Sequence, residues 1–242
     1  MYNTNAYFLE EWLKLKLKKL FKSLSKFELI LWLSSLVIVS GAFIISNSSD
    51  YLTLLASLIG VTALIFVAKG YVIGQVLTVV FALFYGIISF HFKYYGEVIT
   101  YLGMTTPIAI LTVISWLRHP YKDTSEVEVR YMNKIQVLTM IILTLVVTVI
   151  FYFILKALGT ASLLFSTISI TTSFLASYLT LMRNPFYGLG YGANDIVLII
   201  LWIIASIENP SYIPMIVCFV MFLINDCYGF FNWQRIKKRQ TA

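Results

Sequence analysis

The residues best suited to chemistry in this chain are two Asn-Asp pairs, Asn194-Asp195 and Asn225-Asp226, and both lie inside long apolar segments. Acidic side chains in such segments are costly, and they normally face a bundle interior or a wet cavity on a substrate or ion path. Asn and Asp also hydrogen-bond neighbouring helices. The sequence leaves both readings open: a ligand site, or contacts that hold helices together.

Helical geometry places the two pairs at similar depth. Asn194 lies about 12 Å and Asp226 about 10 Å from the same end of two adjacent antiparallel segments, at a rise of ~1.5 Å per residue. Neighbouring residues on a helix point about 100° apart. One member of each pair can therefore bind ligand while the other contacts another helix. Asp195 shares a helical stripe with two aromatic residues and Leu198, and Asp226 repeats that spacing: Tyr191, Leu198, Trp202; Phe222, Gly229, Trp233.

The surroundings of the pairs have the composition of a membrane protein. Of the 242 residues 60% are hydrophobic and 12% are charged, and the mean hydropathy is +0.85. A soluble domain carries about 25% charged residues. The two cysteines share one segment, the two histidines flank loops, and no phosphate-binding glycine loop occurs. We therefore expect no metal, cofactor or direct use of ATP.

Eight apolar segments are long enough to cross a bilayer as helices of roughly 20 residues. The predicted fold class is an all-α integral membrane protein with eight transmembrane helices. The predicted spans are 28–46, 50–67, 70–91, 97–117, 134–156, 160–182, 186–206 and 210–232.

The basic residues predict the orientation of these spans. With a cytoplasmic N-terminus and eight crossings, all but Lys93 and Lys156 of the 18 Lys and Arg residues fall on the cytoplasmic side, as the positive-inside rule requires. We therefore expect a multi-pass protein of the bacterial cytoplasmic (inner) membrane with both termini in the cytoplasm. We interpret the net charge of +7 as basic residues that set the orientation in the membrane and contact anionic lipid headgroups. Binding of nucleic acid is the weaker interpretation.

The first residues are a separate case. Residues 1–27 carry leucines at helical spacing among lysines, at positions 13, 17, 20 and 24, which is typical of an amphipathic helix lying on the membrane surface. The apolar run that follows is too long for a signal-peptide core. We expect the segment to be retained.

The spans form two copies of a three-helix unit. Lys69-Gly70 aligns with Arg183-Asn184, and Trp116 aligns with Trp233. An odd number of crossings inverts a directly following copy, so a single linking helix restores a parallel orientation. The predicted organisation is an additional helix at 28–49, a first repeat at 50–117, a loop and linking helix at 118–159, a second repeat at 160–233 and a basic tail at 234–242. Parallel repeats are a transporter architecture with substrate bound near the midplane.

This three-one-three plan resembles the PnuC family of bacterial vitamin-precursor transporters, which is similar in architecture to the SWEET sugar transporters. The stretches that carry the resemblance are "AKGYVIGQVLTVVFALFYG", "ITYLGMTTPIAILTVISWLRHPY", "RNPFYGLGYGANDIVLIILW" and "FVMFLINDCYGFFNWQR". The resemblance implies facilitated uptake of nicotinamide riboside, which is then trapped by phosphorylation in the cytoplasm. Possible partners are this solute, the lipid bilayer and further copies of the chain.

Only the second repeat supplies strongly polar residues to the candidate site. The positions of the first repeat that match the two pairs are nearly apolar, around Leu77-Thr78 and Ile108-Ala109. Such asymmetry suits a ribose that needs hydrogen bonds and a cationic pyridinium that needs aromatic rings, with cation–π contact worth ~0.5–2 kcal/mol. The candidate substrate-binding residues are Asn194, Asp195, Asn225, Asp226, Gln75, Thr106, Tyr187, Tyr191, Trp202 and Trp116.

Three other functional classes are alternatives to this transporter. A proton- or ion-coupled transporter of another vitamin, such as thiamine, would use Asp195 or Asp226 to carry the coupling proton. An intramembrane aspartyl protease is disfavoured because "GYGAND" lacks the Gly-x-Gly-Asp spacing. A structural membrane protein or receptor would show no transport at all.

Overall fold

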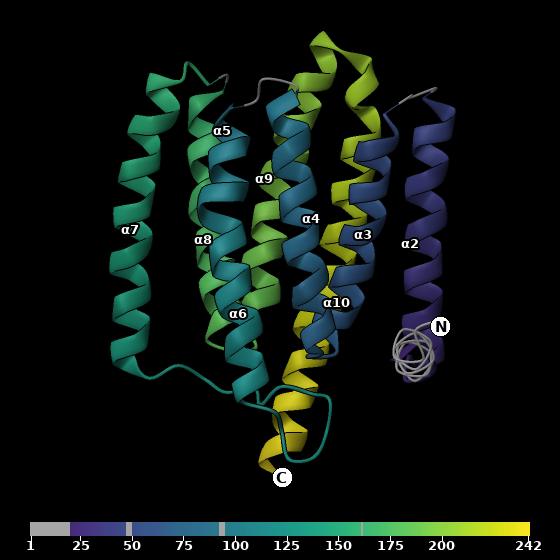
Figure 1. The fold of residues 1–242 in the computed structure, drawn as a ribbon, viewed down its shortest axis with the longest axis vertical. Helices are drawn as coiled ribbons and strands as arrows, with labels where there is room; N and C mark the ends of the chain where they lie inside the picture. The colour runs from purple at the N-terminus through teal and green to yellow at the C-terminus, as the bar shows by residue number, and fades with distance from the viewer. Residues whose placement is uncertain (1–19, 47–49, 92–94, 161) are drawn as a thin grey trace, which may run out of the picture.

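The computed structural model describes residues 20–46, 50–91, 95–160 and 162–242, and these residues are almost entirely helical. The predicted surface helix at 1–27 lies mostly outside them. The helices are α2 (Lys26–Ile45), α3 (Tyr51–Ala68), α4 (Val72–His91), α5 (Tyr95–Val98), the π-helix η1 (Ile99–Thr105), α6 (Thr106–Arg118), α7 (Lys134–Ala157), α8 (Leu163–Leu181), α9 (Tyr187–Glu208), the 3-10 turn η2 (Pro210–Tyr212) and α10 (Ile213–Thr241) (Figure 1).

Several helices begin where the sequence supplies a cap. The hydroxyl of Ser25 accepts from the Glu28 N–H at 3.2 Å and the Glu28 carboxylate accepts from the Ser25 N–H at 2.6 Å, which forms a reciprocal capping box. Asn133 and Gln136 form a second box at the start of α7. These caps satisfy backbone donors that have no partner inside the helix. The predicted boundaries are therefore close to the observed ones.

The eight predicted spans are confirmed: eight helices of the described chain are long and apolar enough to cross a membrane. The largest difference is at the C-terminus, where α10 continues to Thr241 instead of ending near residue 232. Its final turns are held by the loop between α6 and α7, because Gln240 donates to the Val127 carbonyl at 3.0 Å and accepts from the Val129 N–H at 2.8 Å.

The fourth span is not one regular helix. It consists of α5, η1 and α6, and the π-helix ends just before Pro107. Proline lacks an N–H and its ring clashes with the carbonyl four residues earlier, so a wider turn precedes it. The N–H and the hydroxyl of Thr106 both donate to the Tyr101 carbonyl, the hydroxyl at 2.8 Å. Such π turns occur frequently at functional sites.

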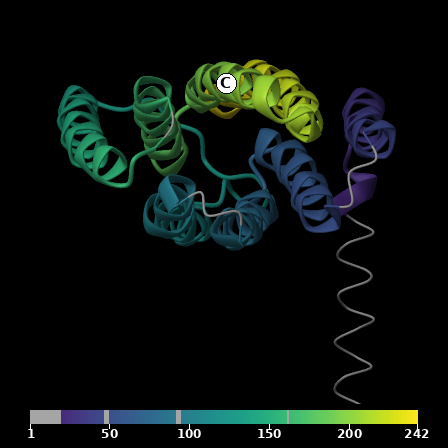
Figure 2. The ribbon, with the colours of Figure 1, turned by 90° about the horizontal axis from the view of Figure 1, so that it is seen from above.

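The two three-helix units pack against each other in a symmetric way. The third helix of the first unit, α6, contacts the first helix of the second unit, α8, while α10 contacts α3 (Figure 2). The linking helix α7 packs mainly on α8, and α2 packs on α3 and α10. The predicted three-one-three architecture with an extra N-terminal helix is therefore observed.

The turn inside each unit also repeats. Gly70 and Arg183 both have a left-handed backbone, with φ of 69° and 59°. In both turns the following residue donates to a carbonyl five positions back: Tyr71 to Phe66 at 3.0 Å, and Asn184 to Leu179 at 2.9 Å. Equal turns reverse α3 into α4 and α8 into α9.

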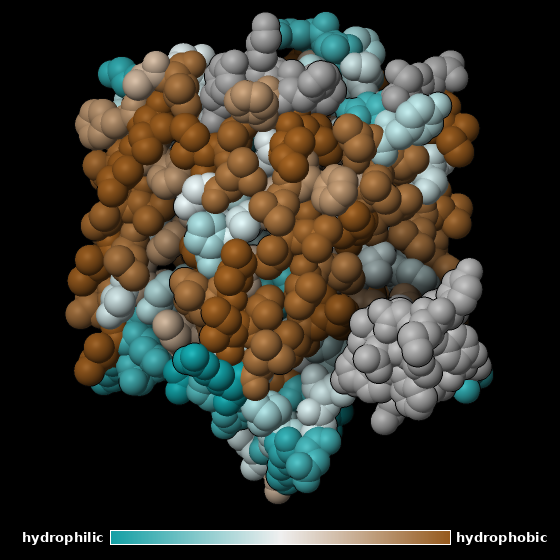
Figure 3. Space-filling model, viewed as in Figure 1, coloured by the Kyte–Doolittle hydropathy of each residue, from teal (hydrophilic) through white to brown (hydrophobic). Residues whose placement is uncertain are grey.

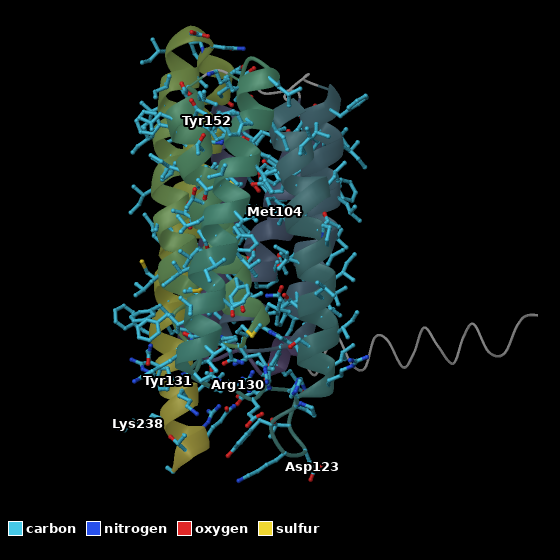
Figure 4. All side chains as sticks on the ribbon, turned by 90° about the vertical axis from the view of Figure 1, so that its left-hand side faces the viewer. Met104, Asp123, Arg130, Tyr131, Tyr152 and Lys238 are labelled. Carbon is cyan, nitrogen blue, oxygen red and sulfur yellow. The ribbon has the colours of Figure 1, made fainter. Side chains whose placement is uncertain are left out.

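Basic residues lie at the end of the bundle that holds the C-terminus, where Lys238 and Arg239 stand in the last turn of α10. A hydrophobic band covers the middle of the face seen in Figure 3, and polar residues gather below it. Arg130 and Lys238 lie at the end that holds the C-terminus, Tyr152 lies near the opposite end and Met104 lies between them (Figure 4). We call the end that holds Arg130 and the C-terminus the basic end.

Candidate functional site

A cavity of about 450 Å³ lies between the start of the fourth span, the first half of α8 and the second half of α9. The turns between α7 and α8 and between α9 and α10 contribute to its wall. Both turns lie at the end opposite the C-terminus (Figure 1), so the cavity belongs to the end opposite the basic end. Its volume is in the range of small-molecule sites.

One wall of the cavity is a stripe of hydroxyl groups on α8. Ser166, Ser169 and Ser173, together with Ser162 just before the helix, all line the cavity. Their spacing of four, three and four residues places them on one helical face. Ser166 and Ser169 are buried from solvent and Ser173 is half-buried. The wall offers several donors and acceptors to a polyhydroxylated solute.

Asn194 lines the deep end of the cavity, and neighbouring hydroxyls fix its orientation. Its Oδ1 accepts from Ser169 at 3.2 Å and from Thr172 at 3.0 Å. The side chain is 7% exposed, and within the described chain no hydrogen bond is recorded for its Nδ2. Because the carbonyl oxygen is already engaged, the amide presents its N–H₂ group as a donor.

Aromatic side chains form another part of the wall. Tyr101, Trp202 and Tyr212 line the cavity. The rings of Trp202 and Tyr212 lie 5.4 Å apart, and Tyr101 packs on Tyr85 at 4.4 Å. Rings in this arrangement can stack on a flat ligand.

The two aspartates contact each other rather than the cavity. Asp195 on α9 and Asp226 on α10 are each 3% exposed, and their carboxyl groups lie next to each other. Among the described residues the buried Asp195 Oδ2 has no hydrogen-bond partner. Two adjacent buried carboxyl groups can share one proton. Neither residue is among those that line the cavity. The sequence predicted both aspartates as substrate-binding residues. In this conformation Asn194 lines the cavity and the two aspartates do not.

Asn225 has a different partner. Its Nδ2 donates to the Ser35 hydroxyl on α2 at 3.0 Å and to the Met221 carbonyl at 2.8 Å. The side chain is 1% exposed and does not line the cavity. Its position matches the alternative that one member of each pair joins helices, and it ties the additional helix α2 to the second repeat.

The other candidate residues lie away from the cavity wall, except Trp202. Tyr191 shares a hydrogen bond of 3.3 Å with Ser177, and Thr106 holds the π-helix through its bond to the Tyr101 carbonyl. Tyr187 packs on Trp233 with ring centres 4.5 Å apart. Gln75 is buried on α4 and Trp116 is buried at the end of α6. None of these five lines the cavity.

The loop between α6 and α7 closes the basic end. The Val127 N–H donates to the Gly70 carbonyl at 2.8 Å, and the Arg130 N–H donates to the Arg183 carbonyl at 3.0 Å. Burial and the neighbouring Arg130 lower the pKa of Arg183, whereas the ion pair with Glu128 at 3.2 Å acts in the opposite direction. One loop therefore bonds to the turn of both repeats.

Sequence reasoning missed part of the cavity wall. The serine stripe was visible as spacing, and Glu97 was visible as an acidic residue that opens the predicted span 97–117. Tyr101 has no such signal because it is one of 16 tyrosines. Among the described residues no group of three or more His, Cys, Asp and Glu could hold a metal ion.

Comparisons with known proteins agree on one family. The family model described as nicotinamide mononucleotide transporter matches residues 50–235. The chain is 25% identical over 230 residues to the nicotinamide riboside transporter PnuC of Neisseria mucosa, covering 93% of this chain and 87% of the relative. It is 23% identical over 212 residues to the protein of the same name from Haemophilus influenzae, covering 87% and 91%.

A solved structure has the same fold. The chain matches the crystal structure of the vitamin B3 transporter PnuC with a TM-score of 0.79 and 26% identity, over 91% of this chain and 96% of the other. That match is longer than residues 50–242 alone, so it includes part of the segment before the first repeat.

Proposed function

From the premise that this chain belongs to the nicotinamide mononucleotide transporter family and is a membrane transporter, we propose that it carries nicotinamide riboside across the cytoplasmic membrane. The observation that carries the proposal is the cavity that combines the Asn194 amide, the α8 hydroxyl stripe and two aromatic rings, Tyr101 and Trp202. A ribose and a flat cationic ring need these groups.

The binding mode follows from the wall. The ribose hydroxyls hydrogen-bond the serines of α8 and the N–H₂ group of Asn194, and the pyridinium ring stacks on Trp202 or Tyr101. A cation over such a ring gains ~0.5–2 kcal/mol where water is excluded. The remaining candidates, including Asp195 and Asp226, support the residues of the cavity wall or contact the ligand in another conformation of the transport cycle.

The basic end faces the cytoplasm in this proposal, as the positive-inside rule indicates. The cavity then opens to the outside, and the loop between α6 and α7 closes the inside. Rocking of the two repeats about the site exposes it alternately to either face. Phosphorylation in the cytoplasm traps the riboside, so a downhill carrier suffices for uptake.

The test is counterflow in proteoliposomes. Vesicles preloaded with unlabelled nicotinamide riboside should accumulate the labelled compound, and a panel of nicotinamide, thiamine, riboflavin and sugars should compete less well. Absence of counterflow for every member of the panel would contradict a transporter and favour a receptor or structural protein.

Proton coupling is the second candidate, and the Asp195–Asp226 contact supports it because two adjacent buried carboxyl groups can share and exchange one proton. Uptake that collapses when an uncoupler dissipates the proton gradient would favour coupling. Uptake that is unchanged by the uncoupler would favour the facilitated carrier that we propose.

Association of copies remains a prediction. The outward faces of α2 and α7 carry exposed apolar side chains such as Val37, Ile135 and Phe153, which suit either lipid or a second copy. Cross-linking in native membranes would separate the two.

A further inference from the structure

We propose that Glu97 is the counter-ion that makes the cavity select a positively charged solute. The inference rests on the proposed function and adds the residue that distinguishes a pyridinium cation from a neutral ring. It assigns the charge contact to a residue that lines the cavity, whereas Asp195, a candidate substrate-binding residue in the sequence analysis, does not line it.

The charged side chains of the cavity wall are all acidic. Its ionisable residues include two carboxylic acids, Glu97 and Glu208, and none of the described lining residues is Lys, Arg or His. A cleft lined by one sign of charge and walled by low-dielectric material focuses the field and concentrates counter-ions. The ligand that fits such a wall is a cation.

Among the residues that the structure describes, Glu97 has no cationic partner that would neutralise it. Among the described residues it takes part in no salt bridge, whereas Glu28 pairs with Lys69 at 3.0 Å and Glu128 pairs with Arg183. The Glu97 side chain is half-buried. An ionisable residue inside a membrane span without a partner indicates a functional contact.

Asp195 cannot take this role in the observed conformation. Its carboxyl group lies next to Asp226 and does not line the cavity, whereas the neighbouring residue Asn194 does. Asn194 offers a neutral N–H₂ donor, which suits a hydroxyl group rather than a cation. Recognition of the two halves of the ligand is therefore divided between Asn194 and Glu97.

The two acids differ in exposure, and this decides between them. Glu208 is the last residue of α9 and is exposed, whereas Glu97 is half-buried. Along α9 the distance from Asn194 to Glu208 is about 21 Å, at a rise of ~1.5 Å per residue. Exposed charges are screened by water and salt. Glu208 lies at the rim, so Glu97 is the better counter-ion for a bound ligand.

The test compares two ligands of nearly equal shape. Nicotinamide riboside is a cation, and its 1,4-dihydro form has the same ribose and a neutral ring. Binding of each to the purified full-length protein is measured by isothermal titration calorimetry for the parent, Glu97→Gln and Glu97→Asp. The pyridinium nitrogen carries no N–H, so its contact with Glu97 is a charge–charge attraction, which is strong where water is excluded. We therefore expect Glu97→Gln to weaken binding of the cation about tenfold or more. Binding of the neutral form should change by less than about twofold, and Glu97→Asp should retain the preference for the cation, because it keeps the negative charge.

Glu208→Gln is the matched control because it removes the same charge at the rim. It should leave the ratio of the two dissociation constants near that of the parent. Equal weakening of both ligands by Glu97→Gln, no change in either, or the same selective loss in Glu208→Gln would each overturn the assignment of Glu97. A parent protein that binds neither riboside contradicts the proposed function instead, and cationic thiamine and neutral riboflavin then serve as the pair that tests Glu97.

Discussion

Trp116 and Trp233 make reciprocal hydrogen bonds between the two repeats. The indole N–H of Trp116, near the end of α6, donates to the Thr180 carbonyl of α8 at 3.1 Å. The indole N–H of Trp233 in α10 donates to the Val67 carbonyl of α3 at 2.9 Å. Their rings lie 5.3 Å apart. Each tryptophan thus joins the third helix of one repeat to the first helix of the other.

This arrangement predicts that both tryptophans act in stability. Trp116→Phe and Trp233→Phe each remove one buried hydrogen bond, worth ~0.5–1.5 kcal/mol, and leave a smaller ring. We expect a lower Tm for both variants in detergent and ligand affinity close to that of the parent. Lost affinity at an unchanged Tm would instead restore Trp116 as a binding residue.

Asn194 and Asn225 should separate binding from assembly. Asn194→Ala removes the donor in the cavity, and the loss of one neutral hydrogen bond, ~0.5–1.5 kcal/mol, corresponds to roughly 2- to 10-fold weaker binding of nicotinamide riboside. Asn225→Ala removes the bond to Ser35 and should lower Tm without changing affinity. Titration calorimetry and thermal unfolding of both variants test this. If only Asn225→Ala loses binding, the site lies against α10 and the assignment of the cavity is wrong.

Asp195 should tolerate an amide but not an apolar side chain. Asp195→Asn keeps the shape and can still hydrogen-bond Asp226, so we expect binding of the cationic and neutral ribosides to change by no more than about twofold. Asp195→Leu leaves the buried Asp226 carboxyl without its partner, which costs ~1–3 kcal/mol and should lower Tm. A selective loss of the cation in Asp195→Asn would show that Asp195 is the counter-ion after all.

Gly188 allows α9 to approach α10. A Cβ atom at this position would lie 2.6 Å from the Asp226 carbonyl oxygen and 2.7 Å from the Phe230 nitrogen, closer than atoms can pack. Gly188→Ala must therefore push the two helices apart, and we expect a lower Tm and weaker riboside binding. Gly41→Ala is the matched control, since nothing lies within 4 Å of its Cβ position. Its Tm should stay near that of the parent.

The orientation of the chain in the membrane can be tested with a reporter enzyme. The positive-inside rule places both termini in the cytoplasm, so a reporter enzyme that is active only outside the cytoplasm should be silent when fused after Ala242. The same reporter placed in the turn after Glu208 should be active. A reversed pattern would turn the cavity toward the cytoplasm and make this conformation inward-facing.

Much of the architecture follows from the sequence, because a bilayer leaves few alternatives. Every backbone polar group must be satisfied within the membrane, so an apolar segment of sufficient length becomes a helix. The repeat was also predicted from the sequence, but its register differs by one residue: the sequence aligned Lys69 with Arg183, whereas the matching left-handed turn residues are Gly70 and Arg183. The π-helix before Pro107 was not predicted from the sequence, although a proline inside a span indicates a local break in the regular helix.

The sequence by itself determined that Asn194 and Asp195 share one helix at one depth and point in different directions. Only the tertiary structure decided that Asn194 faces the cavity while Asp195 faces Asp226. Helical periodicity fixes the angle between two side chains, but the rotation of the whole helix depends on what it packs against. Here α9 packs between α8 and α10, and the close approach at Gly188 to α10 sets that rotation. For the same reason Glu97, at the margin of its span in the sequence, became part of the cavity wall only through folding.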